Sequence, residues 1–99
     1  MIYHVISEAV WNEQLHSEFL VVPSLQTEGF IHCCTKHQVE GVRARYFKGQ
    51  PGLLLLEIDE SKLESEVRFE KSTNDELFPH VYGPINKRAI LSVTQLREE

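Results

Sequence analysis

Three of the five histidines lie in segments whose neighbouring residues would hold an imidazole in a fixed place. His4 lies in IYHVI, His32 in EGFIHCCT and His80 in LFPHVYGP, each beside aromatic, apolar or backbone-restricting residues. An imidazole titrates near neutral pH, so it can bind a ligand or take part in catalysis. The three segments lie far apart in the sequence, and they form one site only if the fold brings them together.

The segment EGFIHCCT is typical of a strand that leads into a helix. Gly29 allows a positive φ or a close backbone approach, and we expect Thr35 at a helix amino terminus, where free N–H groups attract a phosphate. Two alternatives are open. In the first, both residues are structural: His32 forms its hydrogen bonds within a sheet, and Thr35 only caps the helix. In the second, Cys33 or Cys34 is a nucleophile that His32 activates.

The segment LFPHVYGP is restricted by its prolines. Because Pro79 and Pro84 bias the residues before them, we expect His80 and Tyr82 to project from a stiff, turn-rich stretch over residues 72–84 that is oriented before a ligand arrives. The alternative is a structural corner in which Tyr82 buries its ring and His80 bonds a backbone carbonyl.

Among the acids, Glu70 is the best candidate for chemistry, on an expected strand over residues 67–70. A strand carboxylate near an imidazole can orient it or stabilise developing positive charge. The alternative is a surface ion pair with Arg68 or Lys71, which would contribute little. Glu28 is a second acid that could orient a histidine of the neighbouring strand.

The length and the net charge of the chain limit the number of domains and the classes of partner. The 99 residues fit one domain over residues 1–99, of a size that can fold alone as a monomer, although the oligomeric state stays open. A net charge of −5, from 15 acidic and 10 basic side chains, argues against nucleic acid as a partner. No apolar run can span a bilayer, and the first residues lack signal-peptide features, so we expect a cytoplasmic protein without a membrane partner.

The cysteines give no disulfide framework. Cys33 and Cys34 are adjacent, and neighbouring cysteines pair only in a rare, strained ring. Spaced metal-ligand motifs are absent, so we assign no metal site, and a His4, His32 and His80 cluster is the one metal alternative that stays open.

The elements that would position these residues follow from apolar periodicity and end signals. Ser7 is placed to cap a helix over residues 8–19, on which Trp11, Leu15 and Phe19 form one apolar stripe. Thr35 and Gln38 form a capping box for a second main helix. The expected strands cover residues 2–6, 30–34, 53–58, 67–70 and 89–96, with turns or short helices over 23–28 and 59–63. The prediction is an α+β domain of about five strands and two main helices.

Several motifs in order carry a family resemblance. The combination of YHV near the start, a tryptophan in the first helix, EGFIHCCT followed by Gln38, LLLLEID, Phe69-Glu70 and LFPHVYGPIN resembles the bacterial domain of unknown function 952 family over essentially the whole chain. The resemblance implies a split mixed or antiparallel sheet with an ADP-ribosylation-like fold, similar to ADP-ribosyltransferases and RNA 2′-phosphotransferases.

That superfamily implies an NAD cleft, so the expected partner is a nucleotide-like small molecule, with NAD as a substrate and no firm cofactor. In the ligand-binding set, His4 would hold the ribose hydroxyls, Thr35 would meet a phosphate and Tyr82 would stack on the nicotinamide.

The implied catalytic set is His32, His80 and Glu70. Glu70 would stabilise cationic charge at the anomeric carbon as the nicotinamide bond breaks, and His80 would act as acid or base. The alternative function is a non-catalytic module that binds a small ligand in the same cleft, and the less favoured one is the three-histidine metal site.

Overall fold

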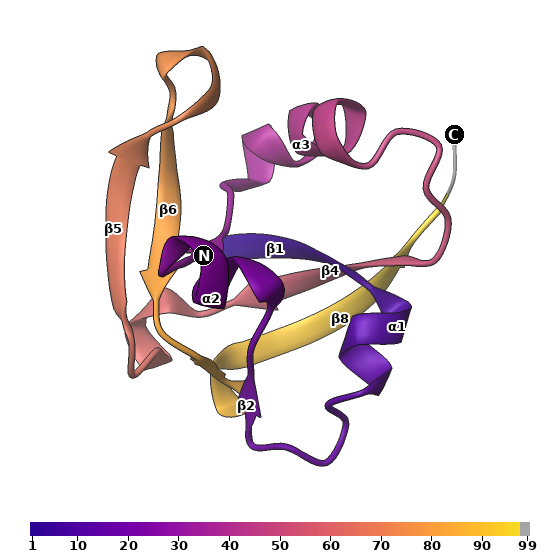
Figure 1. The fold of residues 1–99 in the computed structure, drawn as a ribbon, viewed down its shortest axis with the longest axis vertical. Coiled ribbons are helices and arrows are strands. Elements are labelled where there is room, and N and C mark those ends of the chain that lie inside the picture. The colour runs from indigo at the N-terminus through magenta and orange to yellow at the C-terminus, as the bar shows by residue number, and fades with distance from the viewer. Residues whose placement is uncertain (98–99) are drawn as a thin grey trace.

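The computed structural model describes residues 1–97, whose eight strands form three antiparallel sheets around a few short helices (Figure 1). The α+β class is confirmed, whereas the expected number of about five strands is wrong. The first sheet has the order β1 (Ile2–Ser7), β4 (Leu53–Ile58), β8 (Ile90–Leu96). The second has the order β3 (Ile31–His32), β6 (Leu77–Tyr82), β5 (Glu66–Lys71), and the third pairs β2 (Phe19–Leu20) with β7 (Ile85–Asn86).

The first sheet follows from the apolar run at residues 53–58. β4 is its central strand, and a strand with neighbours on both edges and apolar residues on both faces is buried almost throughout. In the pairing of β1 with β4, His4 lies opposite Leu56, which has no exposed surface. The predicted strand at the amino end is therefore confirmed, and it carries His4 on the sheet.

The second sheet corrects the prediction of a turn-rich stretch over residues 72–84, because residues 77–82 form its central strand β6. Pro79 does not break this strand. Its carbonyl accepts a hydrogen bond from the N–H of Cys33 at 3.0 Å, so the carbonyl and the nitrogen without a proton both face β3. The hydrogen bonds between β5 and β6 therefore do not need an N–H from Pro79. The pairing with β3 covers only residues 80 and 81, which leaves room for a residue without an N–H.

The first helix is much shorter than predicted. Ser7 accepts the N–H of Val10 at its start, as expected, but α1 (Glu8–Asn12) ends after five residues. Trp11 packs on the core, whereas the Leu15 side chain is 53% exposed and Phe19 is 39% exposed, so the apolar stripe over residues 8–19 is wrong. The Gln14 amide explains the break, because it exchanges two hydrogen bonds with the backbone of Val21.

The predicted turn or short helix over residues 23–28 and the predicted capping box are both present. α2 (Pro23–Glu28) ends at Gly29, whose φ of +89° is the left-handed conformation that glycine adopts without strain. Thr35 and Gln38 form the predicted capping box before the short 3₁₀ turn Lys36–Gln38 and α3 (Val39–Tyr46). Three more 3₁₀ turns cover Glu60–Lys62, Thr73–Asp75 and Lys87–Ala89. Within residues 1–97, none of these helices has the length and apolar character needed to cross a membrane.

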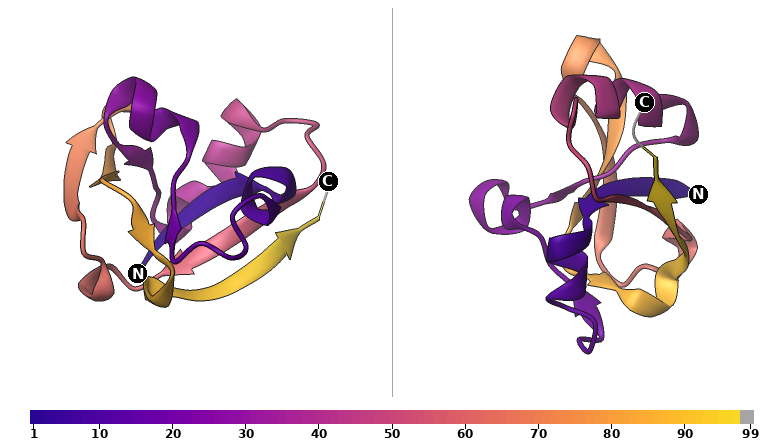
Figure 2. Two further views of the ribbon diagram at one scale, coloured as in Figure 1. Left: turned by 60° about the horizontal axis from the view of Figure 1, so that its bottom comes forward. Right: turned by 90° about the vertical axis from the view of Figure 1, so that its right-hand side faces the viewer.

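The two larger sheets meet at one backbone bridge. Tyr3 and Cys34 exchange two hydrogen bonds, of 2.8 and 2.7 Å, and so connect β1 to the segment that follows β3. The β5–β6 hairpin runs across the direction of β1 and β4, and α3 lies beside the turn of that hairpin (Figures 1 and 2). The main core lies between the sheets and includes Ile2, Ile6, Leu20, Ile31, Leu54, Leu56, Ile58, Val81 and Ile85.

Candidate functional site

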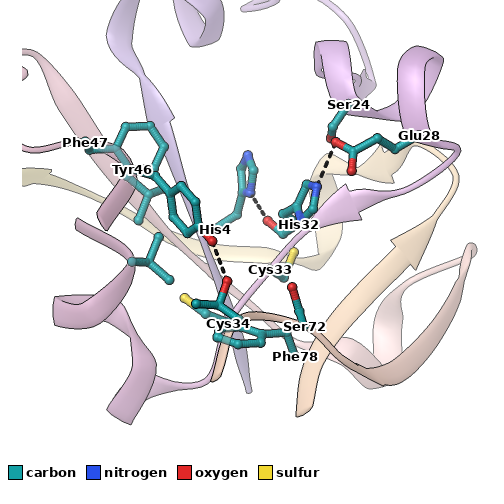
Figure 3. Close-up of a pocket in the computed structure, with 13 residues that line it drawn as sticks. His4, Ser24, Glu28, His32, Cys33, Cys34, Tyr46, Phe47, Ser72 and Phe78 are labelled. Atoms are coloured by element: carbon teal, nitrogen blue, oxygen red, sulfur yellow. Dashed lines mark hydrogen bonds and ion pairs between the residues drawn. The ribbon is translucent and has the colours of Figure 1, made fainter. Parts of the chain in front are cut away.

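A pocket of about 460 Å³ opens where the two sheets, α2 and α3 come together (Figure 3). Its lining comes from β1, α2, β3, α3, the turn between β5 and β6, and β6 itself. The lining residues are His4, Val5, Ser24, Glu28, His32, Cys33, Cys34, Val42, Tyr46, Phe47, Ser72, Thr73 and Phe78. Two of the three predicted histidines, His4 and His32, therefore share one cavity.

His4 is fixed by the backbone of the neighbouring sheet. Its Nδ1 lies 2.6 Å from the carbonyl oxygen of His32. A carbonyl can only accept, so Nδ1 carries the proton. Burial lowers the pKa of His4 to about 4, which keeps the ring neutral near pH 7. Nε2 then carries a lone pair, has no hydrogen-bond partner within residues 1–97, and belongs to a ring that lines the pocket.

His32 and Glu28 form a polar pair at the open side of the pocket. Nε2 of His32 lies 3.0 Å from Oε2 of Glu28, and both side chains are about half exposed. The prediction that Glu28 orients a histidine is confirmed. Glu28 is the last residue of α2, and β3 begins three residues later, so the tight turn at Gly29 brings the carboxylate within hydrogen-bond distance of Nε2 of His32.

Glu70, His80 and Tyr82 form a second cluster, on the same face of the second sheet as His32. Oε1 of Glu70 lies 2.8 Å from Nδ1 of His80 and accepts the hydroxyl of Tyr82 at 2.5 Å. These bonds lower the pKa of Glu70, the Tyr82 hydroxyl most, and Glu70 in turn raises the pKa of Tyr82. Arg68 lies 4.5 Å above the Tyr82 ring and pairs with Glu66.

Aromatic contacts join the second cluster to the pocket. His32 lies directly opposite His80 in the β3–β6 pairing, and their ring centres are 5.5 Å apart. Phe30 stacks on His80 with ring centres 4.1 Å apart and meets the edge of His32 at 4.8 Å. His80 is 4% exposed, and its buried Nε2 has no hydrogen-bond partner within residues 1–97. Such unpaired buried polar atoms are rare in folded proteins, and a catalytic role is one of their known explanations.

The fold thus brings five of the six predicted site residues into one contiguous region: His4, His32, His80, Glu70 and Tyr82. Of these, only His4 and His32 line the pocket. Thr35 lies outside its lining, and the N–H of Thr35 already donates to Oε1 of Gln38 at 2.9 Å.

Several lining residues were not singled out by the sequence. Tyr46 and Phe47 close one side of the pocket from the end of α3, and the Tyr46 hydroxyl is hydrogen-bonded to Thr73. Phe78 lies within the motif LFPHVYGP, whereas nothing in the sequence around Ser24 or Ser72 indicates a role in a site. Only the tertiary arrangement identifies them.

The two cysteines line the pocket but are poor nucleophiles. Both are nearly fully buried, and burial raises the pKa of the Cys34 thiol to about 11 and that of Cys33 further. The thiolate is the reactive form, so neither thiol is activated at neutral pH. The nucleophile alternative is therefore not supported by the environment of Cys33 and Cys34.

The metal alternative lacks a suitable arrangement as well. Within the described residues 1–97, no group of three or more His, Cys, Asp or Glu side chains is placed to hold a metal ion.

Comparison with known proteins supports the fold and the family. The crystal structure of protein CC0527 from Caulobacter crescentus is similar, with a TM-score of 0.90 and 26% identity over 99% of this chain and 87% of that chain. The solution NMR structure of CC0527 gives a TM-score of 0.84 at 26% identity, covering 99% of this chain and 85% of that one. No curated protein matches the chain. The family described as "Protein of unknown function (DUF952)" matches residues 5–93, and the chain belongs to this family.

Proposed function

We propose that this protein binds a nucleotide-like small molecule of the NAD type, with a ribose and its attached base in the pocket beside His4. The observation that carries the proposal is the unpartnered Nε2 lone pair of a neutral, immobilised histidine in a largely apolar cavity. A pocket with few, convergent polar groups is the usual form of a small-molecule site.

A ribose fits the polar groups at the pocket. Its hydroxyls donate hydrogen bonds, and Nε2 of His4 accepts one without any change in protonation. The ring is held in place before binding by its bond to His32, so little side-chain entropy is lost when the ligand arrives. Tyr46, Phe47 and Phe78 supply aromatic surface for a base.

The family resemblance supports the same ligand class. An arrangement similar to ADP-ribosyltransferases would place a first-strand histidine at the ribose, and His4 lies on β1 at the pocket. The fold-level likeness to that superfamily is part of this proposal.

A second candidate function is cleavage of the bond between nicotinamide and ribose. Its support is the state of Glu70, a carboxylate whose pKa is lowered by Tyr82 and His80. In that reaction the C1′–N bond breaks, nicotinamide leaves with the electron pair, and water or another nucleophile forms the new bond to C1′. Glu70 would stabilise the cationic transition state. Because neither Glu70 nor His80 lines the pocket, binding is the better supported function.

Calorimetric titration with NAD, ADP-ribose and nicotinamide tests the proposal. We expect NAD to bind the wild type, and His4→Asn to weaken that binding at least about tenfold, which is 1.4 kcal/mol. Asparagine retains a donor near the position of Nδ1 and removes the acceptor at Nε2. His16→Asn is the matched control, because His16 is exposed and does not line the pocket. Equal affinities in both variants, or no binding of any ligand to the wild type, would reject the proposal.

A further inference from the structure

We infer that the pocket prefers an unphosphorylated, cationic nucleoside, of the N-ribosylpyridinium type, to the corresponding nucleotide. This inference rests on the proposed function and specifies which chemical form of the ligand the site selects. Nicotinamide riboside has the required chemistry, because its pyridinium ring is positively charged and its hydroxyls donate hydrogen bonds.

The first observation is the charge of the lining. Within the described residues 1–97, no lysine or arginine lines the pocket, and the acid that lines it is Glu28. A nucleotide phosphate needs positive charge or free N–H donors, and recognition of phosphate relies on Arg and Lys for this reason. A phosphate placed here would instead approach a carboxylate, in a protein whose net charge is already −5.

The nearest basic side chains of α3 are engaged elsewhere. Arg43 donates to the carbonyl oxygen of Arg97 and pairs with Glu40. Arg45 is exposed, and its guanidinium carbon lies 5.9 Å from the centre of the Tyr46 ring. Neither arginine lines the pocket.

The second observation is the direction of the two helices at the pocket. Ser24 and Glu28 of α2, and Val42 and Tyr46 of α3, line the pocket from one side of each helix. Because Glu28 and Tyr46 are the last residues of these helices, the carboxyl end of each helix lies at the lining. A helix carboxyl end carries partial negative charge from its carbonyl groups, which favours a cation and disfavours an anion.

The third observation is that two polar groups of the lining, on His4 and Ser24, can accept hydrogen bonds from a ligand but cannot donate them. Nε2 of His4 has a lone pair, and the Ser24 hydroxyl already donates its proton to the carbonyl oxygen of Phe30 at 2.8 Å. Ribose hydroxyls can donate to such groups, whereas phosphate oxygens are themselves acceptors. The faces of the aromatic lining residues Tyr46, Phe47 and Phe78 also attract a cationic ring.

The test is calorimetric titration of the wild type with nicotinamide riboside, nicotinamide mononucleotide and NAD at pH 7.5. We expect the riboside to bind at least about tenfold more tightly than the mononucleotide, which corresponds to 1.4 kcal/mol. If the mononucleotide or NAD binds as tightly as the riboside or more so, and His4→Asn weakens that binding, the preference is wrong while the proposed function stands. If none of the three binds, both fail.

Two variants that each remove one negative charge test whether Glu28 causes the preference for the riboside over the mononucleotide. Glu28→Gln keeps the side-chain size and an acceptor for His32, and we expect it to reduce the ratio of riboside to mononucleotide affinity by about threefold or more, as removal of one nearby charge should. Glu13→Gln makes the same change in net charge at an exposed position outside the pocket, and should leave the ratio unchanged. Equal ratios in the wild type and Glu28→Gln would overturn the assignment of the preference to this pocket.

Discussion

His4 donates a hydrogen bond of 2.6 Å from Nδ1 to the carbonyl oxygen of His32. This bond connects β1 to β3. It lies close to the bridge between Tyr3 and Cys34, which joins β1 to the segment that follows β3. It fixes both the orientation of the His4 ring and the nitrogen that carries the proton. The same bond leaves the lone pair of His4 on Nε2, which the proposed binding of a ribose would use.

The buried His4 should make folding stability depend on pH. Burial lowers its pKa from the ordinary 6.5 to about 4, so between these values the unfolded chain binds the extra proton. The stabilisation is complete above pH 6.5 and decreases as the pH falls towards 4, by at most about 3 kcal/mol. Urea unfolding of the wild type and His4→Asn at several pH values checks this. The difference between their unfolding free energies should shrink over this range, and a constant difference would contradict the prediction.

Glu70 should be held ionised by Tyr82. The Tyr82 hydroxyl is the largest cause of the lowered Glu70 pKa, ahead of His80. Removing it in Tyr82→Phe should therefore raise the Glu70 pKa, which carboxyl ¹³C NMR measures directly. A lowered carboxyl pKa stabilises the fold above its ordinary value of 4.5 and loses this effect as the pH falls through the folded-state value. An unchanged Glu70 titration in Tyr82→Phe would show that the hydrogen bond is not formed.

Loss of Glu70 should separate catalysis from binding. If the protein cleaves NAD, Glu70→Gln is expected to abolish nicotinamide release, measured by chromatography, while NAD affinity changes by no more than about threefold, since Glu70 does not line the pocket. Glu66→Gln on the same strand is the control, because Glu66 does not line the pocket and, among the described residues 1–97, its ion pair is with the exposed Arg68. A wild-type protein that binds NAD and releases no nicotinamide would be a binding module, and cleavage would be rejected.

The cysteines should be protected from alkylation. Cys33 and Cys34 are buried and their pKa values are raised by that burial, so iodoacetamide at neutral pH should modify neither in the folded protein. Mass spectrometry of native and urea-denatured samples makes the comparison. Rapid labelling of either thiol in the native protein would restore the nucleophile alternative that burial argues against.

Local signals in the sequence predicted the elements that depend on neighbouring residues. The capping box of Thr35 and Gln38, the Ser7 cap and the positive φ of Gly29 all formed as predicted, because each depends on residues within a few positions. The apolar run at residues 53–58 likewise identified the buried central strand.

Contacts between residues that are not near neighbours in the sequence explain the wrong predictions of helix length and of a turn-rich stretch. The helix after Ser7 stops early because Gln14 bonds the backbone of Val21, seven residues away. Pro79 made the stretch over residues 72–84 look like a loop, yet its position opposite the end of β3 lets it lie in a central strand.

In the candidate site, too, the sequence predicted the residues of interest but not the contacts between them. The sequence identified His4, His32, His80, Glu70 and Tyr82 as residues of interest from their local surroundings. It could not show that Glu70 bonds His80 and Tyr82 together, or that α3 places Tyr46 at the pocket, because these contacts depend on the pairing of β5 with β6 and on the packing of α3.

The most direct measurement is long-range ¹H–¹⁵N NMR of the histidine side chains during separate titrations with nicotinamide riboside and NAD. If Nε2 of His4 accepts a hydrogen bond from the ligand, its nitrogen resonance should move in a saturable way together with the amides of Cys34 and Val42, while the exposed His16 does not respond. A His4 resonance that stays unchanged up to millimolar concentrations of both ligands would contradict the proposal that this pocket binds a nucleoside.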